Sequence, residues 1–301
     1  MSKYPEFDEL ETSTRTSTVY SNLTLDLHKI YHGLPITVLK DEEIPKTKKR
    51  ALIDKKKLSA PRGSILSVQN RHEVRGLDTR TKKPAKVTPV DWFLNQITIL
   101  ISNGERILNI MMFSDCLKIV GCKELDDCLD AINLFFRTFV EENRDWWKLK
   151  VESDEPPTFC VSSVMRNMDF HLGFDIDRCA LNALMNEPKY ENIVFMSQYE
   201  TTGHTNVNIK TFGDGEEVYY LLKMKSGEET EVEELNSNPF SKKKKSKKSY
   251  VTFIVFSSSE TIISGRSEKA MKERYEFFIN TIKDNRHLIE DVPRKKEVKE
   301  L

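Results

Sequence analysis

The chain repeats one order of secondary-structure signals twice along its length. In the first half, residues 96–113 form two apolar runs joined by Asn103-Gly104, a strong hairpin signal. A third strand is predicted over 117–120, and Gly121 then precedes an amphipathic helix over 125–139. In the second half, strands over 250–256 and 261–264 are followed by Gly265 and a helix that has Ser267 as its N-cap. Both halves therefore predict the same antiparallel motif.

The earlier parts of the two halves match as well. Residues 17–35 predict a strand and a short helix with Asp26 as N-cap, and residues 162–185 predict a strand ending near Phe174 and a second short helix. The short helices start 151 residues apart, at 26 and 177, and the two glycines lie 144 apart. A nearly constant offset indicates an internal duplication. We therefore expect repeats over 1–150 and 151–301, joined near Pro156-Pro157, in a chain of 301 residues.

Three charged segments interrupt this pattern. Residues 40–62 and 78–91 are rich in Lys and Arg and contain prolines, so each predicts a solvated loop or insertion. Residues 225–249 join an acidic run to the lysine tract SKKKKSKK. Because blocks of like charge repel themselves, this segment predicts a disordered loop between two strands, which can be removed without loss of the fold.

Composition narrows the function classes. Lys+Arg and Asp+Glu both number 47, so the net charge is zero and a generally basic, nucleic-acid-coating protein is disfavoured. The five cysteines contain no CxxC pair and are read as free thiols. The start of the chain lacks signal-peptide order and no long apolar stretch follows, so a soluble intracellular protein is expected. Motifs of the common nucleotide-binding, hydrolase and zinc-protease classes are absent from the sequence.

The duplicated pattern resembles the TATA-box-binding protein family, over about two thirds of the chain. Ser17–Val19 and Leu25–Leu27 carry the family's residues at its spacing. The segments IMMFSDCLKIVG (110–121) and FIVFSSSETIISG (253–265) look like its paired signature of apolar strand, Phe, Ser-rich turn, strand and Gly. The added charged loops are most similar to those of the divergent TATA-binding-like proteins of large DNA viruses.

The resemblance implies an α+β fold in which two repeats share one curved antiparallel sheet, the saddle, with helices on its convex face. The concave face would lie along the DNA minor groove, and phenylalanines would wedge between base steps. Phe113 and Phe256 match these wedge positions, and Phe93 is a third candidate whose spacing is about three residues too long. His204 stands near the fourth position, where the family has Phe-Pro.

Four further residues stand at DNA-reading positions of the family, and two of them, Asn167 and Ser264, fit its pattern. Asn167 corresponds to a central asparagine of the second repeat, whereas Thr14 replaces its counterpart in the first. Ser264 supplies the small hydroxyl before the strand-ending glycine, and Val120 stands there in the first repeat. The second repeat thus keeps more of the DNA-reading pattern.

Each of these residues also has a structural interpretation. An aromatic side chain at a strand end usually packs in the core or along an edge, and Asn167 could cap a turn. His28 and His32 have a metal-compatible spacing without a nearby partner, so an exposed helix face and no metal are expected. Buried small hydrophobes are expected at Cys116, Cys122 and Cys128. Trp146 and Trp147 are expected to fasten the end of the long helix.

The sequence therefore predicts a DNA-binding transcription initiation factor without catalysis or cofactor, engaging AT-rich promoter DNA. By the resemblance, its partners would be double-stranded DNA, general transcription factors and RNA polymerase, with no membrane, in the nucleus or in a viral factory or virion. The alternative is a protein-interaction scaffold that kept the saddle and lost specific DNA binding. Acidic residues on the concave face would favour that alternative. A nuclease would need an acidic metal-binding cluster, which the sequence does not reveal.

Overall fold

The chain folds into two compact units, each formed from segments that are distant in sequence. The structure is a computed structural model and describes residues 4–40, 44, 57–70, 73–78, 96–151, 154–199, 206–213, 218–225, 230–240 and 249–291. The first unit comprises Thr14–Val164 and Glu217–Lys244, and the second comprises Met1–Ser13, Met165–Glu216 and Lys245–Leu301. The predicted repeat boundary between residues 150 and 151 concerns the sequence and stays a prediction.

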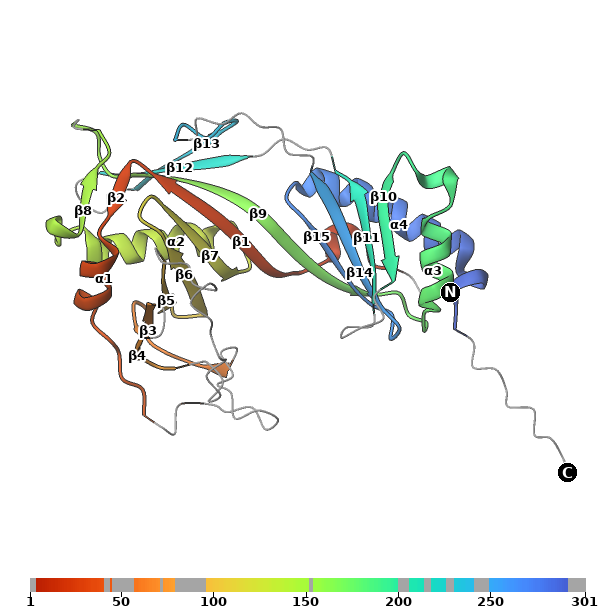
Figure 1. The fold of residues 1–301 in the computed structure, drawn as a ribbon, viewed down its shortest axis with the longest axis horizontal. Coiled ribbons are helices and arrows are strands. Elements are labelled where there is room, and N and C mark those ends of the chain that lie inside the picture. The colour runs from red at the N-terminus through yellow and green to blue at the C-terminus, as the bar shows by residue number, and fades with distance from the viewer. Residues whose placement is uncertain are drawn as a thin grey trace, which may run out of the picture. The chain divides into compact units, whose positions relative to one another are not determined.

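An antiparallel sheet in the order β4-β3-β5-β6-β7-β1 forms the centre of the first unit (Figure 1). Helices α1 (Leu27–Gly33) and α2 (Leu125–Phe135) lie on one face of it, and one π-helical turn (Phe136–Val140) extends α2. The strands are β1 (Thr12–Ser21), β3 (Ile65–Asn70), β4 (Glu73–Gly76), β5 (Ile97–Ser102), β6 (Ile107–Met112) and β7 (Cys116–Cys122). A small separate pair joins β2 (Leu23–Leu25) to β8 (Trp147–Leu149), after a 3-10 turn at Arg144–Trp146.

The second unit has its own antiparallel sheet, in the order β10-β11-β14-β15-β9. Helices α3 (Arg178–Met185) and α4 (Glu268–Ile289) cover one face, and 3-10 turns lie at Phe7–Glu9 and Pro188–Tyr190. The strands are β9 (Thr158–His171), β10 (Val194–Tyr199), β11 (Asn206–Phe212), β14 (Tyr250–Phe256) and β15 (Glu260–Gly265). Strand β9 begins in the first unit and ends in the second.

The two sheets repeat one strand order. Strands β3-β5-β6-β7-β1 of the first unit correspond in order to β10-β11-β14-β15-β9 of the second, and along the chain a helix follows both β7 and β15. The predicted α+β class with a duplicated antiparallel motif is therefore confirmed. The face of each sheet that packs against the helices is called the inner face, and the opposite one is called the outer face.

Side-chain caps start three of the helices that pack on the two sheets. Asp26 Oδ1 accepts from the Lys29 amide at 3.1 Å, and Asp177 Oδ1 accepts from the Ala180 amide at 3.0 Å. The Ser267 hydroxyl accepts from the Ala270 amide at 3.3 Å at the start of α4. These caps satisfy amides that have no partner inside the helix. From these starts, apolar side chains at helical spacing pack onto the inner faces and form one core per unit.

Two expectations about the charged segments were wrong in part. Residues 225–249 do not form a loop throughout, because Thr230–Leu235 is strand β13, which pairs with β12 (Tyr219–Met224), and β12 pairs with β9. Leu58 and Ala60, within the predicted solvated loop 40–62, are buried. Residues 79–91 lie outside the described residues. Strands β3 and β4 had no clear sequence signal.

Candidate nucleic-acid interface

The outer face of the second sheet carries a row of short hydrogen-bonding side chains. Phe253, Val255 and Ile263 point into the core, so alternation places their neighbours on the outer face. The strand registers pair Asn167 with Ser264, Ser264 with Thr252, and Thr252 with Lys210. Four adjacent strands thus present an amide, two hydroxyls and an ammonium group in one line, all half-buried.

Asn167 lies in the middle of β9 rather than at a turn, so the turn-cap interpretation was wrong. Its backbone carbonyl accepts from the Ser13 hydroxyl at 3.3 Å. Its side-chain Oδ1 is shielded from solvent and has no hydrogen-bond partner among the described residues. The Asn167 side-chain oxygen therefore keeps unused acceptor capacity beside Ser264, the partner that the sequence singled out.

The neighbouring rows are apolar at the centre and acidic at one side. Ile254 pairs with Ile262, and Ile262 pairs with Asp169. Glu260 pairs with His171 one step further along the same two strands. Asp169 and Glu260 are both exposed. This face therefore combines the apolar and short polar surface that suits a minor groove with two carboxylates that repel phosphate.

Phe256 ends β14 on the outer face and is half-buried, as expected for a strand-end residue outside the core. It lies opposite Asn206 of β11, and the turn that follows is held by the Ile176 amide, which donates to the Ser257 carbonyl at 2.9 Å. His204, two residues before Asn206, lies outside the described residues. The structure thus places Phe256 at the sheet end where a wedge was predicted.

Sequence reasoning missed a second aromatic group, at the other end of the same strands. Phe195, Phe212 and Tyr250 form a cluster whose ring centroids are 4.8 to 6.1 Å apart. Phe195 keeps 50% of its surface exposed. The alternation of β11 and β14 would have placed Phe212 and Tyr250 on the outer face, but a β-bulge in β10 hides the position of Phe195 from the sequence.

The outer face of the first sheet mixes polar and apolar side chains. Val120 pairs with both Asn109 and Thr16, and Lys118 pairs with Met111. Phe113 follows β6, is half-buried, and closes a turn through its amide, which donates to the Cys116 carbonyl at 2.9 Å. Thr14 is half-buried on β1, next to a bulge between Arg15 and Thr16. Phe93 lies outside the described residues.

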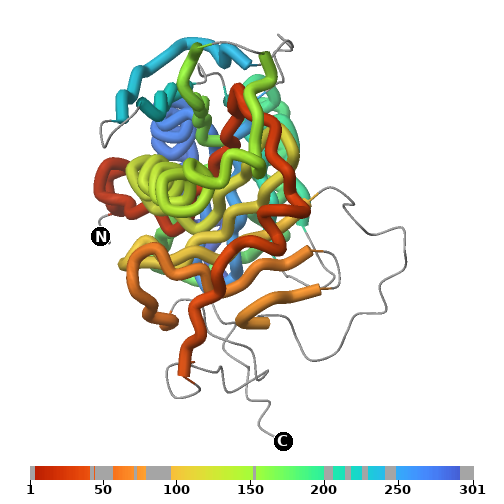
Figure 2. The backbone as a smooth tube through the Cα atoms, turned by 90° about the vertical axis from the view of Figure 1, so that its left-hand side faces the viewer, coloured from red at the N-terminus to blue at the C-terminus, as the bar shows by residue number. Residues whose placement is uncertain are grey.

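One end of this first outer face is covered by the chain itself. Leu58 and Ala60 pack on Leu66 and Leu100, and Ile107 lies against the same small cluster. Leu100 alternates with Ile99 and Ile101, which belong to the core, so the cluster lies on the outer face. Figure 2 looks onto the first unit, with β3 and β4 in orange below the yellow strands of the same sheet.

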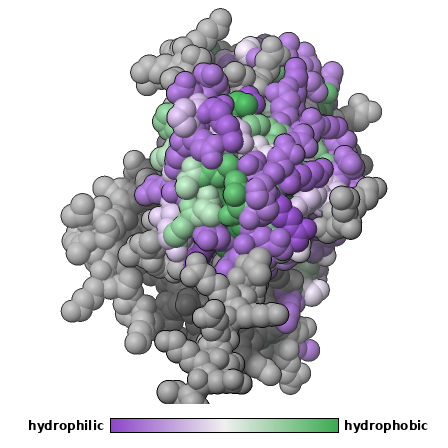
Figure 3. Space-filling model, turned by 90° about the vertical axis from the view of Figure 1, so that its right-hand side faces the viewer, coloured by the Kyte–Doolittle hydropathy of each residue, from purple (hydrophilic) through white to green (hydrophobic). Residues whose placement is uncertain are grey.

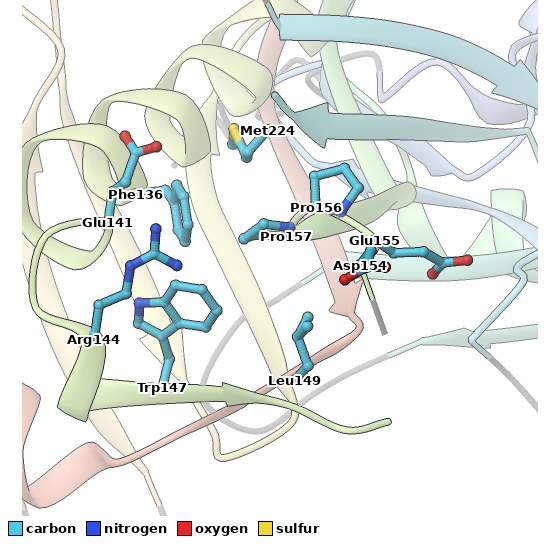
Figure 4. Close-up of a pocket in the computed structure, with 10 residues that line it drawn as sticks. All are labelled: Phe136, Glu141, Arg144, Trp147, Leu149, Asp154, Glu155, Pro156, Pro157 and Met224. Atoms are coloured by element: carbon cyan, nitrogen blue, oxygen red, sulfur yellow. The ribbon is translucent and has the colours of Figure 1, made fainter. Parts of the chain in front are cut away.

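A pocket of about 310 Å³ lies in the first unit, beyond the end of α2 (Figure 4). The Arg144 guanidinium lies 4.9 Å from the ring centroid of Trp147, whose indole N–H donates to the Val140 carbonyl at 3.0 Å. Trp146 is buried beneath Gly33. Trp147 therefore fastens the end of the long helix as predicted, whereas Trp146 packs against the end of α1. The lining consists of Phe136, Glu141, Arg144, Trp147, Leu149, Asp154, Glu155, Pro156, Pro157 and Met224.

The remaining surfaces add no site. His28 and His32 are exposed on α1 with ring centroids 4.4 Å apart, and the described residues contain no group of His, Cys, Asp and Glu side chains that could hold a metal ion. Within the same part of the chain, no helix is both long and apolar enough to span a membrane. Figure 3 shows the side with α3 and the end of α4, which is mainly hydrophilic around one small apolar patch. Such patches are common on protein surfaces.

Comparisons with known proteins give one type of match. No protein-family model matches the sequence, and no curated protein matches it either. Among solved structures, one described as Methanococcus jannaschii TBP aligns with 93% of this chain and 99% of its own. The sequence identity is 12%, and the TM-score is 0.42.

Proposed function

We propose that this protein is a transcription initiation factor of the TATA-box-binding type, which binds AT-rich duplex DNA in the minor groove through outer sheet faces. The observation that best supports this proposal is the row of Asn167, Ser264, Thr252 and Lys210 on the outer face of the second sheet. Ile254 and Ile262 lie beside this row, and Phe256 lies at the strand end. The minor groove of A·T pairs displays only acceptors, so short donors on an apolar sheet suit it. A half-exposed phenylalanine at a strand end suits insertion between base steps.

The proposal gives each residue of the second unit a distinct role. Phe256 would wedge into a base step, and Asn167 and Ser264 would hydrogen-bond base edges. Lys210 would meet a phosphate, which contributes affinity on any sequence. Phe113, Val120 and Thr14 would be the corresponding contacts of the first unit, with Phe93 and His204 as additional wedge positions. No step requires catalysis or a cofactor.

Binding to fluorescent AT-rich and GC-rich duplexes at two salt concentrations tests this function. Phe256→Ala should weaken AT-rich binding by more than about tenfold, which corresponds to about 1.4 kcal/mol. Asn167→Ala should mainly narrow the preference for AT over GC, because the guanine amino group distinguishes the G·C pair in this groove. Lys210→Ala should lower affinity on both duplexes and reduce the salt dependence.

Leu288→Ala is the matched control for Phe256→Ala, because Leu288 is an apolar side chain on α4 that is 55% exposed. It should bind like the unaltered protein. Equal binding to both duplexes that neither Phe256→Ala nor Asn167→Ala changes would show that the outer face does not read DNA.

A second function is favoured by Asp169 and Glu260. Two exposed carboxylates on the outer face of the second unit oppose a phosphate backbone, as expected for a scaffold that binds transcription proteins instead. General transcription factors and RNA polymerase are the expected partners under either of these two functions. The narrower likeness to proteins of large DNA viruses, and a nuclear or viral location, remain predictions.

A further inference from the structure

Residues 57–60, called the strip, lie over the outer face of the first sheet. Lys57 and Ser59 are exposed while Leu58 and Ala60, each 6% exposed, point onto the sheet. From Leu58 to Ala60, one residue faces the sheet, the next faces solvent and the third faces the sheet again. Leu58 and Ala60 contact the cluster formed with Leu66 and Leu100. The strip therefore forms a second layer over β3 and β5.

Hydrogen bonds fix the strip to the sheet end. The Ser102 hydroxyl donates to the Ala60 carbonyl at 2.7 Å, and the Gly63 amide donates to the Ser102 carbonyl at 2.8 Å. The Ser102 amide donates to the Ser64 carbonyl at 3.0 Å. Arg62 forms a two-pronged ion pair with Asp130 of α2 and donates to the Asn103 carbonyl at 3.1 Å. The Ser102 hydroxyl thus holds the end of the strip, and the contacts of residues 62–64 hold the segment that follows it against the sheet and α2.

The corresponding strand of the second unit is more open. Strand β11 occupies the place that β5 has in the first unit, and its outward residues Asn206, Asn208 and Lys210 keep part of their surface exposed. Leu100, which faces outward from β5, is 1% exposed. The two outer faces therefore differ in how much sheet they can offer to a ligand.

We propose that residues 57–60 are a built-in cap that closes the β3–β5 end of the first outer face to duplex DNA. This inference rests on the proposed function and specifies its footprint. Packed β layers lie about 10 Å apart, whereas the minor groove is about 7.5 Å deep, so a groove edge resting on the cap cannot reach β5. In the first unit, the contacts that the sheet makes to DNA are then restricted to β1, β7 and the uncovered part of β6, besides the proposed wedges Phe113 and Phe93.

The cap itself is tested without DNA. Leu58→Asn places a polar amide in the apolar contact, and Ser59→Asn is the matched control at the exposed neighbouring position. Binding of the dye ANS should rise severalfold for Leu58→Asn and stay unchanged for Ser59→Asn, with the far-ultraviolet circular dichroism of both proteins retained. If Leu58→Asn does not fold, the milder Leu58→Ala replaces it, with faster hydrogen exchange in β5 as the readout. Equal behaviour of position 58 and 59 variants would overturn the cap.

Hydroxyl-radical footprinting on AT-rich duplex tests the consequence for DNA. Uncovering two strands about 4.8 Å apart exposes about 10 Å of sheet, which is about three base pairs for a duplex lying across the strands. Leu58→Asn should extend the protected stretch by about that length, and Ser59→Asn should not. An unchanged footprint in a variant that binds the dye overturns the inference and leaves the proposed function standing. Absence of DNA binding by all three proteins contradicts the proposed function, and the dye result then still decides the cap.

Discussion

At the scale of single residues, the five cysteines differ in their surroundings. Cys179 is exposed at the start of α3, whereas Cys122, Cys128 and Cys160 are buried. Burial raises the pKa of Cys160 to about 11, and a hydrogen bond with Cys128 together with burial raises the pKa of Cys122 far above the usual thiol range. Burial and the nearby Asp115 also raise the pKa of Cys116. Because the thiolate is the reactive form, these thiols should be inert.

We therefore expect one fast-reacting thiol when the native protein meets a chromogenic disulfide reagent at pH 8. Cys179 should react quickly with the reagent, whereas the buried thiols should react only after denaturation. Cys179→Ser is expected to abolish the fast phase, and Cys160→Ser should leave it intact. A fast phase of more than two equivalents would mean that a core opens more readily than its packing implies, since Cys116 is only half-buried.

The two strand-ending glycines are needed for different reasons, which the sequence could not separate. Gly121 has a φ of +103°, a conformation that other residues rarely adopt. Gly265 lacks this constraint, but a Cβ there would lie 2.6 Å from Met271 Cγ, on α4. The matching positions in the two repeats thus share an amino acid and a place in the fold, while one constraint is backbone strain and the other is close packing.

This difference predicts how alanine variants respond to a second change. Gly121→Ala should lower the free energy of unfolding by about 1–3 kcal/mol through backbone strain. Gly265→Ala should be destabilising through its clash, so Met271→Ala should relieve part of the loss and make the double variant more stable than the sum of single effects implies. Urea unfolding of the unaltered protein, the three single variants and the two double variants that contain Met271→Ala measures this. If the effects of Gly265→Ala and Met271→Ala on the free energy of unfolding simply add, the clash is excluded. If Met271→Ala also reduces the loss caused by Gly121→Ala, purely local backbone strain at Gly121 is excluded.

At the scale of elements, the β12–β13 hairpin shows why a charge block misled the sequence analysis. Like charges along one segment repel, yet here the opposite charges come from the neighbouring strand. Lys225 lies 2.9 Å from Glu231, and Lys223 lies 3.5 Å from Glu233. Hydrogen bonding and attraction from Lys225 lower the pKa of Glu231. Cross-strand pairing of this kind depends on register, which a one-dimensional pattern does not contain.

The hairpin is anchored by its apolar side. Leu222 is buried in the core of the first unit, and Val232 lies opposite it on β13 with 49% of its surface exposed. Leu222→Ala should lower the free energy of unfolding by about 2–5 kcal/mol, whereas Val232→Ala should change it by less than about 1 kcal/mol. Thermal or urea denaturation distinguishes the two. Similar losses at both positions would mean that the exposed strand contributes as much as the core contact.

Helix starts and strand alternation were predictable because their causes are local. Asp26 and Ser267 cap helices through amides three residues away, and Phe256 ends a strand whose alternation is visible in the sequence. The cap at Leu58 was not predictable, because its contact with Leu100 joins segments 42 residues apart across a charged insertion. The acidic pair was not predictable for the same reason, since Asp169 and Glu260 become neighbours only through strand register.

At the scale of the whole molecule, zero net charge makes local charge decisive for any duplex contact. The second outer face offers Lys210 as a cation but also exposes Asp169 and Glu260, and the first offers Lys118 on β7. The proposed function and the scaffold alternative therefore differ in what the two carboxylates do. If the protein binds DNA as proposed, the two carboxylates weaken duplex binding. If the protein is a scaffold, the two carboxylates have no effect on duplex binding.

The double variant Asp169→Asn, Glu260→Gln tests this difference. A carboxylate about 10 Å from a phosphate repels it by about 0.4 kcal/mol in water. Removing two such charges should therefore tighten duplex binding by about fourfold at 0.01 M salt, where the Debye length is about 30 Å. The gain should disappear near 0.15 M salt because screening then acts within about 8 Å.

Glu273→Gln, Glu276→Gln is the matched control, because it removes the same charge from exposed positions on α4, on the helix side of the second sheet. Tighter binding by the outer-face pair alone would locate the duplex on the sheet. An equal gain from both pairs would reflect net charge only, since a uniform field acts on any approaching duplex. No gain from either pair, in a protein that folds normally, would mean that the carboxylates face no phosphate, and the scaffold function would then replace DNA binding.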